Sequence, residues 1–563
     1  MSLAAIDVVI IAVYLAIVVA IGLWFARRAS GGLTDYFNAG RRMPWYLIGT
    51  SMAATTLAAD TPLAVTELVR QGGLAGAWYG WSAAIGTVTA AVFFSRLWRR
   101  SGVLTDAELV ELRYAGRPAA ALRATRAAYL ALPVNCLILG WVIFAMVSIV
   151  ETVAGVRGDV VLPVILLLAI GYSTASGMWG VVATDAFQMV VAVVGLVLLA
   201  GFSVAAAGGL DALAALPAET TALVPSSSSA LLPLEVFAVY LGMQWWATRN
   251  ADGGEYIGLK LFSARSVADA QLGMVWYAAI EYVVKMWPLI VAALASIVLY
   301  PQLASDHEAY PRLIADHLPV GLRGLLVAAL LAAFMSTVDT HLSWGASYLV
   351  NDLYKRFVRP DASERHYVRA SRIAMVLIGV SAALVSRALT SVADTWKLLL
   401  ALGSGQGLVV LLRWYWWRIN AWSEISAMLA SAVFTVIAFQ VWPGQGDYAV
   451  RLIAIVVGST AVWLAVTLLT PPEPMQVLRA FHDRVRPRGG FWRPVAGPPD
   501  RRGGGRDLLA WLAGVVFVYA ATFAVGFLLL GPRSLGAALV GGAALAPTVM
   551  LRLLRAGEEE AGG

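Results

Sequence analysis

Residues 330–344, "LLAAFMSTVDTHLSW", begin as an apolar helix and then place several polar side chains within two turns. Ala333, Ser336 and Thr337 are three and four residues apart, so they lie on one face of a helix. A backbone carbonyl and two hydroxyls on that face are oxygen ligands, which small hard cations prefer. The stretch therefore predicts a helix that binds a cation within an apolar environment.

The same spacing recurs one turn further on, at Ser336, Asp339 and Thr340. A lone hydroxyl in such a helix usually bonds to the preceding turn, and that is the alternative to ion binding. It is a weaker explanation for three hydroxyls beside an aspartate. We expect His341 to be a local hydrogen-bond partner and not a ligand.

Composition places this helix in a membrane. The chain has 563 residues, of which 60% are hydrophobic and 13% charged, and a soluble protein cannot bury that much apolar surface. Apolar runs long enough to cross a bilayer recur along the chain, and we expect roughly fifteen spans, among them 44–68, 159–178 and 181–206. The run at residues 5–26 has no basic segment before it and no cleavage site after it, so we interpret it as a retained helix.

The basic loops between the predicted spans indicate the topology. Arginines collect near residues 27–42, 96–126, 355–372 and 479–506, whereas the intervening loops are neutral or acidic. The positive-inside rule places these loops in the cytoplasm, the N-terminus outside and the C-terminus inside. The formal charge of +7 is then mostly a topology signal, and nucleic acid is not expected as a partner.

Six ionisable side chains in predicted spans need an explanation, because a charge there is costly unless it is paired, hydrated or bound to an ion. Glu281 and Lys285 are four residues apart with the acid first, which is the better order for an ion pair on a helix. Mutual neutralisation is the simplest interpretation of that pair. The others are Asp60, Asp185, Asp339 and Lys397.

Asp60 lies in "TTLAADTPLAV", residues 55–65, directly before Thr61 and Pro62. Proline removes a backbone donor and clashes with the preceding turn, so we expect the helix to break there. A break at mid-membrane is tolerated where carbonyls line a cavity or coordinate an ion, as in secondary transporters. A simple proline kink capped by Asp60 is the alternative.

Six motifs follow one another along the chain: "DYFNAGRRMPWYLIGTSMAATT" (35–56), "TDAELVELRYAGRP" (105–118), "GMWGVVATDAFQMVV" (177–191), "EYIGLKLFSARSVADAQLG" (255–273), "LAAFMSTVDTHL" (331–342) and "NDLYKRF" (351–357). Taken in order over roughly residues 5–440, the chain resembles the sodium:solute symporter family, which contains the sodium/glucose, sodium/proline and sodium/sialic-acid cotransporters. The motif at 177–191 has Gly180 where the family has alanine.

The resemblance implies an all-α polytopic membrane protein with a leucine-transporter-like fold of two inverted five-helix repeats. The repeats would occupy residues 44–206 and 232–413, after a leading helix and cytoplasmic loop in 1–43. The basic linker at 471–507 would be either a solvated loop or a short amphipathic helix on anionic lipid. The remaining segments would be peripheral helices at 420–470 and C-terminal helices with a tail at 508–563.

Carried over from the family, the main sodium site maps to two hydroxyls and three backbone carbonyls. The hydroxyls are those of Ser336 and Thr337, and the carbonyls are those of Ala58, Thr61 and Ala333. Beside this site, Asp60 matches an aspartate that the proline-transporting branch has in its broken helix.

A second sodium site of the family maps to Asp185, Ser336, Asp339 and Thr340. Asp339 departs from the hydroxyl-only pattern of that site, so two carboxylates would face each other. Two carboxylates a few ångströms apart in low dielectric repel strongly. A cation between them, a shared proton or a basic neighbour would relieve the repulsion.

The solute site is less legible, because the sugar-binding polar set of the sodium/galactose relatives is not reproduced. Lys397 has no obvious partner nearby in the sequence, which predicts a solute with a carboxylate or another anionic group. The paired tryptophans could instead pack or face lipid. The candidate contacts are Thr66, Tyr79, Gln244, Trp245, Trp246, Glu281 and Lys397.

The resulting prediction is a sodium-coupled symporter of the cytoplasmic membrane that imports a small organic solute by alternating access. Na⁺ would be the coupling ion, and solute, sodium and membrane lipid would be the partners. A proton-coupled transporter of the same fold and a transport-deficient solute sensor are the alternatives. An enzyme is not expected, since the chain has only 5 His, no cluster with metal-ligand spacing and no nucleophile–base motif.

Overall fold

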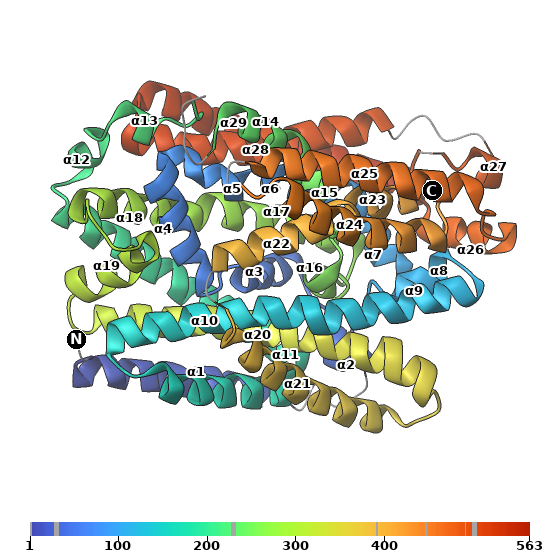
Figure 1. Ribbon diagram of the computed structural model, residues 1–563, viewed down its shortest axis with the longest axis horizontal. Helices are drawn as coiled ribbons and strands as arrows, with labels where there is room; N and C mark the ends of the chain where they lie inside the picture. Colours follow the sequence, from blue (N-terminus) through green and yellow to red (C-terminus); the bar gives the residue numbers. More distant parts are fainter. Residues whose placement is uncertain are drawn as a thin grey trace.

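The structure, a computed structural model, describes residues 3–26, 33–226, 232–389, 392–444, 447–489, 491–497 and 504–562, and at a few of these, Lys397 among them, it describes the backbone alone. These residues are helical apart from turns and two isolated bridges, which confirms the predicted all-α class. Figure 1 shows the helices packed side by side, most of them along the long axis of the molecule.

Ten helices of the described chain are long and apolar enough to cross a membrane. Ala5–Ile21 and Gly158–Leu168 are shorter apolar segments. The ten are Gly116–Ala154, Met178–Ala206, Val267–Leu299, Leu322–Val358, Glu364–Ser386, Leu398–Tyr415, Ala421–Val441, Tyr448–Leu469, Gly504–Leu530 and Arg533–Ala556.

The expected fifteen spans are not confirmed, because several predicted spans are interrupted or joined. Residues 44–68 divide into α3 (Trp45–Thr55) and α4 (Asp60–Gly72). The spans predicted at 159–178 and 181–206 both fall within α11 (Gly158–Ala206). The five-plus-five inverted repeat and its boundaries stay a prediction.

The helix that carries the polar cluster, α20 (Leu322–Ser347), lies inside the bundle. Every side chain from Leu326 to Ser347 is buried. Its neighbours include α1 (Ala5–Ala26), α10 (Asn135–Ala154), α11 and α21 (Glu364–Ser386). A helix that is apolar on most of its circumference is expected to be surrounded by protein. The polar side chains of α20 are therefore enclosed by other helices.

The trailing helices α28 (Gly504–Leu530) and α29 (Arg533–Gly562) lie on the opposite side of the bundle from α1 and α21 (Figure 1). Trp511 donates its indole N–H to the Thr89 hydroxyl over 2.9 Å, and Tyr519 donates to the Trp81 carbonyl over 2.9 Å. α28 therefore packs against the short helices of residues 78–101.

The four basic loops meet at one end of the bundle. The Arg41 guanidinium donates to the Gly102 carbonyl, and that of Arg100 donates to the Arg486 carbonyl over 3.4 Å. Arg356 forms an ion pair with Glu111 at 3.0 Å. These contacts place the loops on the same side of the membrane-spanning bundle. The assignment of that side to the cytoplasm stays a prediction.

Several arginines of this end have a structural role that the sequence interpretation missed. Arg123 pairs with Asp352 at 2.6 Å, Arg126 with Asp106 at 3.1 Å, and Arg413 with Asp252 at 2.7 Å. All of these side chains are less than 10% exposed. These arginines therefore also hold this end of the bundle together, and the interpretation of the net charge as mostly a topology signal stays a prediction.

The described part of the basic linker packs on the bundle. α26 (Met475–Val485) buries Leu478, Phe481 and Val485. The Arg113 guanidinium lies 5.3 Å from the Phe481 ring centre and 5.0 Å from that of Trp492, within the range of cation–π contacts. The linker thus contains a short amphipathic helix, one of the two expectations, and its buried face packs on protein. Its contact with lipid stays a prediction.

Candidate ion and solute site

Four residues separate the end of α3 at Thr55 from the start of α4 at Asp60. The helix break therefore lies just before Pro62, slightly earlier than expected. Pro62 lies in the first turn of α4, where the missing N–H removes no intrahelical bond. The Ala58 carbonyl cannot receive the usual bond from residue 62, because Pro62 has no N–H. Among the described residues it accepts the Thr61 N–H, over 3.2 Å. The helix is therefore interrupted here and not merely kinked. The carbonyl oxygen of Ala58 can still accept another hydrogen bond or bind a cation.

The centre of α20 meets this break. Thr337 donates its hydroxyl to the Thr55 carbonyl over 2.7 Å and lies 3.1 Å from the Ala333 carbonyl. The Thr61 hydroxyl donates to the Thr56 carbonyl over 3.1 Å. Ser336 Oγ is buried and has no hydrogen-bond partner among the described residues. The structure thus brings together the two segments that the family resemblance assigned to one ion site.

The predicted ion pair of Glu281 and Lys285 is present, with 2.5 Å between Oε2 and Nζ. Both members of the pair also contact Thr56, which mutual neutralisation alone does not explain. Lys285 also donates to the Thr56 carbonyl over 2.9 Å, and the Thr56 hydroxyl donates to Glu281 over 2.5 Å. A carbonyl just past the end of α3 lacks an intrahelical donor, and the ammonium of Lys285 supplies one.

Asp185 has a basic neighbour that the sequence interpretation missed. The Nζ of Lys260 lies 2.8 Å from Asp185 Oδ2 and 2.7 Å from the Ser51 carbonyl, and it also donates to the Thr55 hydroxyl. Lys260 lies on the short helix α16 (Glu255–Leu261), outside every predicted span. Its only signal in the sequence was its place in the motif at residues 255–273.

The other two residues assigned to the second site lie beside the same cluster. Thr340 Oγ1 is 3.0 Å from Thr55 Oγ1. Asp339 interacts electrostatically with both Asp185 and Lys260, and its buried Oδ1 has no hydrogen-bond partner in the described part of the chain. Thr55 therefore contacts residues of both predicted ion positions, Thr337 and Thr340.

A cavity of about 280 Å³ opens beside the break. This volume is close to the lower end of the range of small-molecule sites, roughly 300–1,000 Å³. Asp60, Glu67 and Glu281 bring three carboxylates to its wall, and Asp60 Oδ1 is buried without a described hydrogen-bond partner. Other lining residues include Ala58, Thr61, Gln71, Tyr79, Trp141, Tyr256, Thr337, His341 and Trp396.

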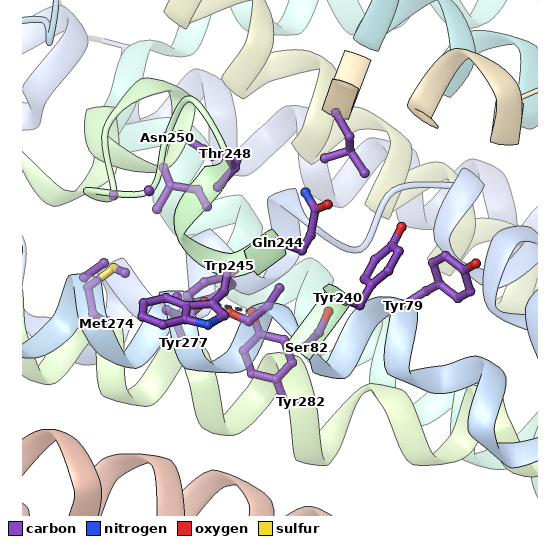
Figure 2. A pocket seen from close by; sticks show the side chains of 18 of the residues that line it. Tyr79, Ser82, Tyr240, Gln244, Trp245, Thr248, Asn250, Met274, Tyr277 and Tyr282 are labelled. Atoms are coloured by element: carbon purple, nitrogen blue, oxygen red, sulfur yellow. Dashed lines mark hydrogen bonds between the residues drawn. The ribbon is translucent and has the colours of Figure 1, made fainter. Parts of the chain in front are cut away.

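A second cavity, of about 210 Å³, extends toward the loop that follows α15 (Trp245–Ala247). Figure 2 shows Tyr79 beside Tyr240 in one part of it, and Trp245, Met274 and Tyr277 in another. The ring centres of Tyr79 and Tyr240 are 4.7 Å apart. Aromatic side chains thus form part of the lining of the second cavity, beside polar residues such as Gln244 and Thr248.

Three residues, Tyr79, Tyr256 and Trp396, line both cavities, so they form the partition between them. The first cavity reaches Gln71 near the end of α4, and the second reaches Asn250. The first cavity therefore extends from the helix break toward the end of α4, and the second lies beyond the partition, toward the loop that follows α15.

The candidate solute contacts divide accordingly. Tyr79 lines both cavities, Glu281 lines the first, and Gln244 and Trp245 line the second. Thr66 and Trp246 are described residues, but they are not among the lining of either cavity. Lys397 lies outside the residues whose side chains the structure describes.

His341 is a hydrogen-bond partner, as expected, but of a residue on another helix, and it also lines the first cavity. Its Nδ1 lies 2.8 Å from Asn135 Oδ1, and Asn135 also donates to the His341 carbonyl over 2.8 Å. The sequence interpretation missed three aromatic lining residues, Trp141, Tyr256 and Trp396. No spacing rule marks an aromatic residue as cavity lining, because most of them pack in helix interfaces.

An interrupted helix that contacts a buried polar helix beside a cavity, within a multi-pass membrane protein, is the arrangement of a secondary transporter. Residues 36–431 match the sodium:solute symporter family, and the chain belongs to that family. Its predicted membership is thereby confirmed.

Curated relatives include sodium/sugar cotransporters. The chain is 28% identical over 467 residues to the sodium/glucose cotransporter of Vibrio parahaemolyticus, which covers 77% of this chain and 85% of the relative. It is 25% identical to sodium/glucose cotransporter 4 of Danio rerio, over 67% of this chain and 62% of the relative. It is 28% identical to the sodium/mannose cotransporter of Bos taurus, over 68% of this chain and 69% of the relative.

Among solved structures, the chain is similar to a Na⁺-coupled sialic acid symporter in a substrate-bound outward-open state. The TM-score is 0.69 at 18% identity, and the match covers 84% of this chain and 99% of the other. This similarity shows that the two proteins share a fold.

Proposed function

We propose that this protein is a sodium-coupled symporter that imports a small polar organic solute through the cytoplasmic membrane by alternating access. The observation that carries the proposal is the contact of Thr337 with the end of α3, directly beside an open cavity. An ion bound at this contact would lie next to a solute in the cavity. Binding of one would then favour binding of the other.

The proposed sodium ligands are the carbonyls of Ala58, Thr61 and Ala333 and the hydroxyls of Ser336 and Thr337. Ser336 Oγ has no described hydrogen-bond partner, and the Ala58 carbonyl lacks its usual helical donor. A hydroxyl has one proton and two lone pairs, so Thr337 can donate to a carbonyl and still coordinate a cation. These features support an oxygen-lined site for a hard cation.

The proposed solute site is the first cavity, and the proposed gate is the partition made by Tyr79, Tyr256 and Trp396. A shift of these side chains would connect the solute with the second cavity. Rocking of helices around a fixed midplane site is the general route of alternating access in such transporters. Sodium would act by stabilising the conformation in which the cavity is complete.

The charges of the first cavity favour a neutral or cationic solute over the anionic one predicted from Lys397. Glu281 is paired with Lys285, which leaves Asp60 and Glu67 as carboxylates in the lining. Carboxylates accept hydrogen bonds from hydroxyl groups and repel anions. The relatives are named for glucose, mannose and myo-inositol, which are neutral polyhydroxylated rings.

The test is uptake of labelled hexoses and inositols into proteoliposomes, with sodium or choline outside, at several pH values. We expect at least one solute to accumulate only with an inward sodium gradient. Accumulation that follows a proton gradient without sodium would favour the proton-coupled alternative. Solute binding without any transport would favour the sensor.

A further inference from the structure

We propose that Lys260 places a tethered ammonium where a second sodium ion would otherwise bind, so that the protein couples one sodium ion to each solute. The inference rests on the proposed sodium-coupled transport and assigns its ion stoichiometry. It chooses the basic neighbour among the three ways to balance the carboxylates of Asp185 and Asp339.

The ammonium satisfies the oxygens that a cation at this position would use. Lys260 Nζ contacts a carboxylate oxygen of Asp185 at 2.8 Å, the carbonyl of Ser51 at 2.7 Å and the hydroxyl of Thr55. An ammonium has three N–H donors, and here each finds an oxygen. The Ser51 hydroxyl donates to the same Asp185 oxygen. The geometry is that of a complete coordination shell around nitrogen.

The ammonium cannot exchange with solvent while the helices keep these positions. The Lys260 side chain is 1% exposed, and that of Asp185 is 0% exposed. Ser51 and Thr55 are buried as well. A sodium ion at the same oxygens would lie close to a like charge in a region of low dielectric. Sodium and Lys260 therefore compete for one position, and the lysine is covalently attached.

The remaining groups fit the same assignment. Thr340 reaches the cluster through Thr55, and Asp339 interacts electrostatically with both Asp185 and Lys260. Asp339 and Ser336 are three residues apart on α20, so a sodium ion at Ser336 lies on the same helix face. One ammonium and one sodium ion would balance the carboxylates of Asp185 and Asp339. A second sodium ion there would leave an excess of positive charge.

The experiment counts sodium ions without any solute, by equilibrium binding of radiolabelled sodium to the purified full-length protein, with choline used to hold the ionic strength constant. We expect the parent to bind one ion with a Hill coefficient near one. Lys260→Met should bind two ions cooperatively, because it frees Asp185. Asp185→Asn added to that variant should return the count to one.

Arg96→Met is the matched control, because Arg96 pairs with Asp507 in another buried ion pair, at 2.6 Å and with side chains 4% and 6% exposed. It removes a buried cation from a partner carboxylate, and it should still bind one sodium ion. A Lys260→Met protein that folds and binds one ion would overturn the inference.

If Lys260→Met does not fold, the number of sodium ions bound by the parent protein tests the inference. Two ions bound to the parent would overturn the role of Lys260 and leave the proposed symport intact. No saturable sodium binding to the parent would overturn the proposed function itself.

Discussion

Thr337, at the centre of α20, donates its hydroxyl to the carbonyl oxygen of Thr55, the last residue of α3, over 2.7 Å. This carbonyl loses its intrahelical donor where α3 stops, so a side chain from another helix replaces that donor. The break is therefore held open by tertiary contacts, with α20 on one side and Lys285 on the other. Loss of these contacts should affect ion binding before it affects folding.

We expect Ser336→Ala and Thr337→Ala each to weaken the apparent sodium affinity by about tenfold or more, equivalent to about 1.4 kcal/mol. Each change removes one oxygen ligand and little volume. Sodium titration of uptake measures the effect. Ser347→Ala is the control, because its hydroxyl donates to the Trp344 carbonyl of its own helix over 2.7 Å. If both variants keep the sodium affinity of the parent, the main site lies elsewhere.

Sodium alone should raise the unfolding temperature of the purified protein. A ligand that binds only the folded state at about 100 times its Kd adds about 2.7 kcal/mol to the free energy of unfolding. Thermal unfolding in sodium chloride and in choline chloride of equal concentration gives the difference. Thr337→Ala should reduce it. Equal stabilisation of the parent by sodium and choline would contradict a specific sodium site.

Glu281→Gln should destabilise the protein by about 2–3 kcal/mol, because it leaves the buried Lys285 ammonium without its partner. The side chain of Lys285 is 0% exposed, whereas that of Glu281 is 15% exposed and therefore partly screened. Replacing both with Glu281→Gln and Lys285→Met should recover most of the stability. Thermal unfolding in detergent compares the three proteins. A double variant less stable than Glu281→Gln would show that Lys285 has a further role in holding the break.

Asp60→Asn should lower solute uptake by about tenfold, as expected for the loss of a charge-assisted hydrogen bond worth 1.5–3 kcal/mol. The buried Oδ1 of Asp60 has no hydrogen-bond partner among the described residues and lies in the cavity wall. Initial rates at several solute concentrations separate affinity from turnover. Asp159→Asn is the control, since that carboxylate is 49% exposed and pairs with Arg157. Unchanged uptake by Asp60→Asn would remove it from the site.

Trp396→Ala should join the two cavities and allow sodium to leak without solute, because Trp396 belongs to the partition. We expect sodium flux in the absence of solute to rise and the accumulation ratio of solute to fall. The flux of labelled sodium into proteoliposomes is measured without solute, and the accumulation of labelled solute is measured with it. Trp422→Ala, on the exposed face of α24 (Ala421–Val441), is the control, since its side chain is 46% exposed. Tight coupling in Trp396→Ala would place the gate elsewhere.

Several features could be predicted because they depend on residues close together in the chain. The hydroxyl face of α20 follows from spacings of three and four residues, and the pair of Glu281 and Lys285 follows from a spacing of four. Pro62 indicated the interrupted helix, although the break lies slightly earlier, because proline is tolerated in the first turn of α4. The family was predictable from the order of its motifs, and residues 36–431 match it.

The partner of Asp185 was decided only by the tertiary structure. Lys260 lies 75 residues away on a short helix that crosses no predicted span, and it reaches the site by its long side chain. The packing of the basic linker was also decided only by the tertiary structure, because Phe481 of α26 and Trp492 beyond it contact the distant Arg113 guanidinium. Helical periodicity tells which residues share a face, because it is set by local backbone geometry. Which face meets which depends on the packing of the whole bundle, and a buried charge takes its partner from whatever that packing brings near.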